Sequence, residues 1–198
     1  MDWNAASLSV SGQKVLDVAA EAFYAEGVAA VGVDALAARS GVSKPTLYVQ
    51  FGSKRDLVAA VLTRRHEVQR ASLEAYLAAV AGDPVERLLA VFDWLADWHA
   101  EHGWRGCAFL NVAAEIPDPT HPSRAVITDH KHWLRDMFTE LARQAGQSDP
   151  EEVGYAVLLL VDGANARLLV DHDQCAAERA KRAAARMLGL PPACQTGA

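Results

Sequence analysis

Apolar residues recur at helical spacing along almost the whole chain, and this pattern limits the fold more than any other feature. Between residues 15 and 23 the apolar positions fall on one face of a helix, and the same spacing returns in later segments. No segment shows the alternation of apolar and polar residues that is typical of a half-buried strand. The longest apolar stretch, residues 155–161, is far shorter than the roughly 20 residues that cross a bilayer. We therefore expect an all-α protein that is soluble and cytoplasmic, with no membrane partner.

Turn and cap residues divide the beginning of the chain into short helices. Gly27 can close the first helix, because glycine accepts the left-handed conformation at a helix end. A second helix is predicted over residues 33–40, and Gly41 turns the chain after it. Ser43 is expected to cap a third helix that carries Pro45 in its first turn and runs to about residue 50. A helix, a tight glycine turn and a second helix make the helix-turn-helix arrangement, whose second helix enters the major groove of DNA.

Caps also mark the later helices. Ser53 and Asp56 have the spacing of a capping box, which predicts a long helix from residue 53 to about residue 80. Asp83 and Asp149 each precede a proline and stand three residues before a glutamate, so each is expected to begin a helix. The helices predicted after residue 81 span residues 84–103, 105–116, 123–145, 150–171 and 174–188.

The net charge of −6 conceals an uneven distribution of charge. Residues 1–65 carry seven basic and six acidic side chains, a balance of +1, whereas the remainder carries twelve and nineteen, a balance of −7. Within residues 39–65 only Asp56 is acidic, and the basic residues are Arg39, Lys44, Lys54, Arg55, Arg64 and Arg65. Local charge determines whether a surface binds phosphate groups. This span is either a DNA-binding surface or a solvated basic face, and charge alone favours the second.

The order of residues in this region closely resembles the DNA-binding head of TetR-family transcriptional regulators. The matching features, spread over about 50 residues, are the Leu-Ala pair of the second helix, Gly41-Val42-Ser43, Leu47-Tyr48, Phe51, Ser53-Lys54 and Leu57. Residues 106–138 are similar, more loosely, to one branch of the family's ligand-binding domain. The resemblance implies a DNA-binding domain at residues 1–54 and a helical ligand-binding and dimerisation domain at residues 55–198. It also implies a homodimeric repressor that binds a palindromic operator and releases it when a small molecule binds.

Six residues in and after the third helix are expected to contact DNA: Lys44, Pro45, Thr46, Tyr48, Gln50 and Lys54. Lys54 is the expected phosphate anchor, because its ammonium and the free N–H groups of a helix start both favour an anion. Tyr48 is similar to the family's phosphate-contacting tyrosine, although a core position is an equal alternative. Lys44 and Thr46 are candidates for contacts with base edges, and Pro45 for a contact with a thymine methyl group.

Two positions depart from the family pattern. Gln50 stands where the family often has an aromatic residue or histidine, so its role is open. Gly32 stands where a Ser or Thr often caps the second helix, which removes one capping bond.

Aromatic and polar residues in the middle of the chain are candidates for a ligand site: Trp98, Phe109, Asn111, Glu115, Trp133 and Asn165. Aromatic residues line small-molecule pockets but are more often simply core. Asn111 and Glu115 are four residues apart, so they share a helical face. A buried Glu115 needs a partner, and the alternatives are an internal pair with Arg167 or a polar anchor for a ligand.

The remaining reactive side chains do not form a convincing motif. Three widely spaced cysteines, Cys107, Cys175 and Cys194, suit reduced thiols better than disulfides or a zinc site. Cys107, near a helix start, is either a reactive thiolate or, more simply, a small buried thiol. The histidines lack the spacing of metal ligands and are expected at the surface or at helix caps. We therefore expect no metal, no cofactor and no catalytic residues.

The last two long helices are expected to form the homodimer. Six alanines between residues 176 and 185 permit close helix approach, although they also suit an ordinary intramolecular face. The expected partners are thus an operator duplex, an unidentified small-molecule effector and a second copy of the chain. The alternatives are a helical ligand-binding protein without specific DNA binding, or an enzyme that uses Cys107 or Glu115.

Overall fold

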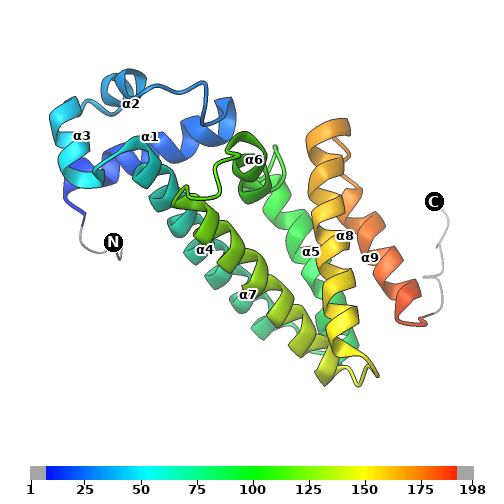
Figure 1. Ribbon diagram of the computed structural model, residues 1–198. Coiled ribbons are helices and arrows are strands. Elements are labelled where there is room, and N and C mark those ends of the chain that lie inside the picture. Colours follow the sequence, from blue (N-terminus) through cyan, green and yellow to red (C-terminus); the bar gives the residue numbers. More distant parts are fainter. Residues whose placement is uncertain (1–7, 191–198) are drawn as a thin grey trace. The chain divides into compact units, whose positions relative to one another are not determined.

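The computed structural model describes residues 8–190, and the described part of the chain contains nine α-helices and no strand (Figure 1). The all-α prediction is therefore confirmed. The helices are α1 (Val10–Glu26), α2 (Val33–Ser40), α3 (Lys44–Phe51), α4 (Lys54–Ala79), α5 (Pro84–His102), α6 (Ala108–Glu115), α7 (Ser123–Gln144), α8 (Pro150–Asp171) and α9 (Ala176–Met187). Most of the predicted helix ends lie within two or three residues of these bounds.

The predicted caps explain why the helices begin where they do. The Ser43 side chain accepts a hydrogen bond from the Thr46 N–H at 3.3 Å and begins α3. Asp83 accepts from the Glu86 N–H at 2.9 Å, and Asp149 accepts from the Glu152 N–H at 3.2 Å. Ser53 and Asp56 also bond as predicted, because Ser53 Oγ accepts the Asp56 N–H at 3.1 Å. These local bonds satisfy N–H groups that have no partner within the helix.

The backbone divides into two compact units. The first contains the chain up to Arg70 together with Ala108–His130, and the second contains Ala71–Cys107 together with Lys131 onwards. The helices α4 and α7 each contribute to both units. The predicted domain boundary between residues 54 and 55 falls at the start of α4 and stays a prediction.

The first unit is built around α1, α2 and α3, which pack against one another. Its fully buried side chains include Leu16, Leu36, Leu47 and Leu57, which come from four different helices. Because Leu47 and Phe51 are buried while the other face of α3 is open, the helix is fixed from one side only. The core therefore holds α3 so that one of its faces is displayed.

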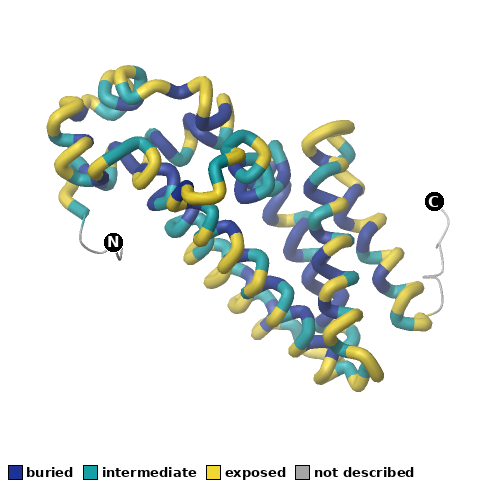
Figure 2. Tube along the Cα trace, viewed as in Figure 1, coloured by how far each residue is buried: buried dark blue, intermediate teal, exposed yellow. Residues whose placement is uncertain are grey.

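The second unit is a helical bundle in which α9 packs against α8 and α5. Phe92 and Phe138 are among its largest fully buried side chains. The burial pattern in Figure 2 shows buried and exposed positions alternating along α8 and α9. The alanines of α9 that were considered for a dimer interface mostly face this core: Ala176, Ala177, Ala180 and Ala184 are buried within the chain. The intramolecular alternative is therefore correct for these four residues.

Helix α8 carries a second apolar face that no other part of the described chain covers. Tyr155, Leu159 and Val170 are exposed by 50, 57 and 62% and lie on one side of the helix, opposite the buried side. By length and composition alone α8 is the only described helix that could cross a membrane, a test that core helices of soluble proteins also pass. Helix α8 therefore exposes apolar side chains to solvent, whereas four of the alanines of α9 are buried.

Candidate nucleic-acid interface and ligand-binding region

The open face of α3 is formed by four neighbouring residues: Lys44, Pro45, Tyr48 and Val49. Residues at positions 45, 48 and 49 lie three and four apart, so they project from the same side of the helix. Tyr48 is 45% exposed, which excludes the core alternative for this tyrosine. The Lys44 ammonium forms an ion pair with the exposed Asp34 of α2. The face thus presents a cation, a phenol hydroxyl and apolar surface, which are the groups that contact phosphates and thymine methyl groups.

Val49 belongs to this face but is absent from the residues that the sequence suggested. Its exposed fraction of 81% is the highest among the large apolar side chains in the described part of the chain. The sequence carried a usable signal, because a helix that buries Leu47 and Phe51 turns position 49 to the opposite side. Val49 follows the exposed Tyr48 in the chain, so the two side chains extend the apolar surface of the open face.

Thr46 and Gln50, two of the predicted DNA contacts, also form hydrogen bonds within the first unit. Thr46 shares a hydrogen bond of 2.9 Å with the Ser43 hydroxyl, as part of the cap of α3. The Gln50 side-chain oxygen accepts from Ser9 Oγ at 2.9 Å and from the Ser9 N–H at 3.3 Å. Gln50 therefore ties the end of α3 to the start of α1. The bonds to Ser9 give Gln50 a structural role, and its contact with DNA stays a prediction.

Lys54 also has a partner that the sequence did not reveal. Its ammonium donates to the backbone carbonyl of Val28 at 2.6 Å and lies 5.9 Å from the centre of the Phe23 ring. Burial lowers the pKa of Lys54, and the nearby Glu115 carboxylate opposes that shift. An ammonium has three N–H donors, so this bond leaves donors for a phosphate oxygen. The phosphate contact of Lys54 stays a prediction.

Most of the other basic side chains of the predicted surface are paired with carboxylates inside the first unit. Arg39 pairs with Glu26, Arg64 with Asp17 at 2.5 Å, and Arg55 with Asp118 at 2.9 Å. The guanidinium of Arg65 lies 4.6 Å from the centre of the Tyr24 ring. Exposed ion pairs of this kind contribute little to stability. They do reduce the excess positive charge that the basic side chains would otherwise present.

The six candidate ligand-binding residues are divided between the two units. Phe109, Asn111 and Glu115 belong to the first unit, and Trp98, Trp133 and Asn165 belong to the second. The Glu115 carboxylate accepts the Ala29 N–H at 3.1 Å, and Arg167 pairs with Asp171 at 2.7 Å. Because Glu115 and Arg167 belong to different units, the internal pair considered from the sequence stays a prediction.

Asn165 lies in the core of the second unit, where the oxygen and the nitrogen of its side chain each have a hydrogen-bond partner. Its side-chain oxygen is 3.1 Å from His99 Nε2, and its side-chain nitrogen donates to the Val161 carbonyl at 2.9 Å. Burial lowers the pKa of His99, and the bond to Asn165 opposes that shift. Each of these bonds uses one of the two acceptor lone pairs or one of the two N–H donors of the amide, so a ligand could bond to Asn165 without replacing either partner.

Lys131 forms a second polar cluster in this unit. Its ammonium donates to Asp162 at 2.5 Å and lies 3.7 Å from the sulfur of Cys107. Burial by itself would lower the pKa of Lys131, but Cys107 and Asp162 outweigh it and raise that pKa. Cys107 is partly buried and Cys175 is exposed, and both are free thiols. Cys194 lies outside the described residues.

Two histidines contradict the expectation of surface or capping positions, because His99 and His130 are buried inside the fold. His121 is also buried, but its Nδ1 accepts the Ser123 N–H at 3.2 Å at the start of α7, which is a capping position. The His130 ring stacks on Phe109 with ring centres 3.6 Å apart, and its Nδ1 lies 3.1 Å from Nδ1 of His66. Among the residues that the structure describes, no group of three or more potential ligands could hold a metal ion.

The packing of α1, α2 and α3 and the open face of α3 define a helix-turn-helix DNA-binding protein. Comparison with family models agrees with this class. Residues 15–61 match the model of bacterial regulatory proteins of the tetR family, and residues 84–184 match the tetracyclin repressor-like C-terminal domain. The chain belongs to the TetR family of transcriptional regulators, and its class as a DNA-binding regulator follows from this membership.

Solved structures and curated relatives support the same assignment. The chain is similar to SCO4454, a TetR-family regulator from Streptomyces coelicolor, with 33% identity, a TM-score of 0.84, and coverage of 90% of this chain and 94% of that one. A TetR-type regulator from Streptomyces avermitilis (sav143) has 30% identity and a TM-score of 0.79, with coverage of 92% and 100%.

Curated relatives match over a shorter part of the chain. The transcriptional regulator YjdC of Escherichia coli is 28% identical over 57% of this chain and 59% of its own length. The transcriptional activator FasR of Mycolicibacterium smegmatis is 37% identical over 46% of this chain and 42% of its own length. The chain thus spans about half the length of the curated relatives it matches.

Proposed function

We propose that this protein is a homodimeric repressor that binds a palindromic operator through α3 and releases it when a small molecule binds in the C-terminal region. The observation that carries the DNA-binding part is the open face of α3, formed by Lys44, Pro45, Tyr48 and Val49. Nothing in the fold of the first unit requires Tyr48 and Val49 to be exposed, whereas reading base edges in a groove does.

The exposed apolar stripe of α8 supports the dimer. Tyr155, Leu159 and Val170 would be costly to leave in water, and a second copy of the same stripe could cover them about a two-fold axis. A two-fold dimer presents two copies of α3, which is why its operator would consist of two inverted half-sites. The outer face of α9 is charged, with Glu178, Arg179, Arg182 and Arg186 exposed. We therefore centre the proposed interface on α8.

The proposed effector site lies in the second unit. The second unit contains Trp98 and Trp133 and the polar groups of His99 and Asn165 within an apolar bundle. Such a combination of aromatic surface and few polar groups is typical of small-molecule sites. The ligand-binding roles of the six candidate residues, and the release of DNA on binding, are proposals that a ligand screen tests.

The first experiment is selection of the purified protein against a random duplex library. We expect an inverted repeat, with an affinity for the selected duplex well above that for a scrambled one and a steep dependence on salt. Failure to select any motif would contradict the regulator and favour a ligand-binding protein or enzyme. A reporter gene behind the selected operator then distinguishes repression from activation, a necessary test because FasR, among the relatives, is named an activator.

The dimer is tested by Leu159→Arg, which places a charge in the centre of the α8 stripe. We expect sedimentation velocity to show a monomer, and the affinity for the full inverted repeat to fall towards that for a half-site. Val68→Arg adds the same charge at another exposed apolar position, on α4, and should leave the dimer intact. A Leu159→Arg protein that sediments as wild type would exclude this face.

A further inference from the structure

The segment Ala108–His130 lies in the same compact unit as the helix-turn-helix, although it is distant in sequence. The family model of the C-terminal domain covers residues 84–184, so it includes this segment. A part of the chain that sequence assigns to the C-terminal domain is therefore packed with the DNA-binding helices. The contacts within this unit show which residue makes the connection.

Glu115, the last residue of α6, contacts the turn between α1 and α2 (residues 27–32). Its carboxylate accepts the Ala29 N–H at 3.1 Å. The same carboxylate oxygens lie 3.0 and 3.1 Å from the position that a Cβ would take at Gly27. Gly27 has a φ of 92°, so both its conformation and the proximity of Glu115 favour glycine there. The end of α6 thus lies directly against this turn.

The same turn is held from a second side by α4. Lys54 donates to the Val28 carbonyl at 2.6 Å, and this carbonyl belongs to the same peptide group as the Ala29 N–H that Glu115 binds. The carboxylate takes the turn's N–H donor and the ammonium takes its C=O acceptor. Two oppositely charged side chains therefore hold the single peptide group between Val28 and Ala29 from its two ends, and hydrogen bonds to charged groups are the stronger kind.

This turn determines how α2 begins. The N-cap of α2 is Gly32, which offers no side-chain hydrogen bond. Because α2 lacks a cap of its own, the position of its first turn depends on the residues that precede it. Helix α2 packs against α3, so a shift of the turn reaches the DNA-reading helix through one intervening element.

The backbone that carries Glu115 is itself anchored. Arg124 donates to the Ala113 carbonyl at 3.1 Å and to the Ile116 carbonyl, at the end of α6. Three residues after Glu115, Asp118 pairs with Arg55 of α4 at 2.9 Å. Glu115 therefore presents its carboxylate to the turn from a fixed support.

We propose that Glu115 is a positioning residue for DNA recognition, which sets the arrangement of α2 and α3 by holding the α1–α2 turn. The inference rests on the proposed operator binding and adds the residue through which the α6 segment acts on it. Because Glu115 and Ala29 are both partly open to solvent, their bond acts mainly on geometry rather than on overall stability.

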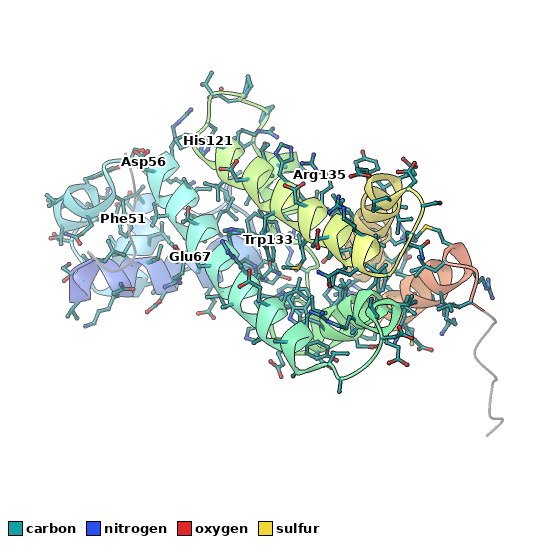
Figure 3. The ribbon with its side chains drawn as sticks, turned by 90° about the horizontal axis from the view of Figure 1, so that it is seen from below. Phe51, Asp56, Glu67, His121, Trp133 and Arg135 are labelled. Atoms are coloured by element: carbon teal, nitrogen blue, oxygen red, sulfur yellow. The ribbon has the colours of Figure 1, made fainter. Side chains whose placement is uncertain are left out.

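The test compares Glu115→Ala and Glu115→Gln with the wild type and with Glu67→Ala. Glu67, labelled in Figure 3, is an exposed residue of α4 in the same unit, so its removal is a matched control for the change in charge. Affinities for the selected operator and for a scrambled duplex are measured at one salt concentration. Amide hydrogen exchange at Ala29 and thermal unfolding are followed in parallel.

For Glu115→Ala we expect the ratio of operator affinity to scrambled-duplex affinity to fall about tenfold, within the range of coupling between sites. The Ala29 amide should exchange faster, and the unfolding temperature should change little. Glu115→Gln keeps an acceptor oxygen for Ala29 and should restore most of the ratio. Glu67→Ala should strengthen binding to both duplexes equally and leave the ratio unchanged.

An unchanged ratio in Glu115→Ala would overturn the inference, as would a loss that merely follows a large fall in unfolding temperature. A wild-type protein that prefers no duplex would overturn the proposed function, and this inference with it. A clear wild-type preference that Glu115→Ala does not alter would overturn the inference alone.

Discussion

Replacing Gly106 by alanine tests the close approach of the α5–α6 loop to α8 in the second unit. Gly106 has a φ of 65°, and a Cβ there would lie 2.4 Å from the carbonyl oxygen of Asn165 and 3.1 Å from its carbonyl carbon. The left-handed conformation costs an alanine about 1–2 kcal/mol. Forcing a methyl group into a filled site costs about 1–3 kcal/mol more. We expect Gly106→Ala to lower the free energy of unfolding by about 2–5 kcal/mol, the sum of these terms.

Gly146→Ala provides the matched control. Gly146 follows α7 in the same unit with a φ of 70°, but nothing lies within 4 Å of the position of its Cβ. It should therefore show only the conformational cost of about 1–2 kcal/mol. The difference between the two variants isolates the contact with Asn165.

Urea and thermal unfolding at one protein concentration provide the measurement. At about 2–4 °C per kcal/mol for a chain of this size, Gly106→Ala should lower the unfolding temperature clearly more than Gly146→Ala. Equal losses in the two variants would refute the reasoning, because they would mean that the loop moves away from Asn165 without cost.

Three further predictions concern single side chains. Val49→Ala should change the base preference at one position of the selected motif while leaving affinity for scrambled DNA unaltered, and repeating the selection checks this. The bonds from Thr120, aided by Arg55, lower the pKa of Asp118 to about 2. The contribution of the Asp118 carboxylate to stability is therefore complete above pH 3.8 and is lost as the pH falls towards 2. NMR titration should find this pKa, and Thr120→Val should raise the pKa of Asp118. Burial keeps the pKa of His99 below 6.5, so the stability of the protein should decrease as the pH falls below 6.5. Asn165→Leu removes the hydrogen-bond partner of His99 and should lower the free energy of unfolding in urea by about 1–3 kcal/mol.

The helices were predictable because their signals are local. Ser43, Asp83 and Asp149 each bond to an N–H group three residues later, so the sequence contains both partners of each bond. The same holds for the buried side of α5, where the apolar spacing identifies the core directly. Interactions between neighbours on one helix need no knowledge of the tertiary fold.

The partners of the charged and polar side chains were not predictable, because they come from distant segments. Lys54 bonds to the carbonyl of Val28, and Gln50 bonds to Ser9, across 26 and 41 residues. A sequence shows that Lys54 is basic and near a helix start, but it does not show which backbone carbonyl lies within reach. Glu115 is the clearest case, since its bond to a backbone amide 86 residues away was neither of the two roles considered for it from the sequence.

The first unit consists of two separate stretches of the chain, and this affects the design of chimeras between this regulator and others. A chimera that transplanted residues 1–54 alone would leave behind Glu115, the acceptor for the Ala29 amide, and Asp118, the partner of Arg55. The portable module is instead the chain up to Arg70 together with Ala108–His130, and moving it requires two simultaneous exchanges. A substitution in α6 or at the start of α7 therefore alters contacts of the helix-turn-helix unit, although it lies outside the first 54 residues.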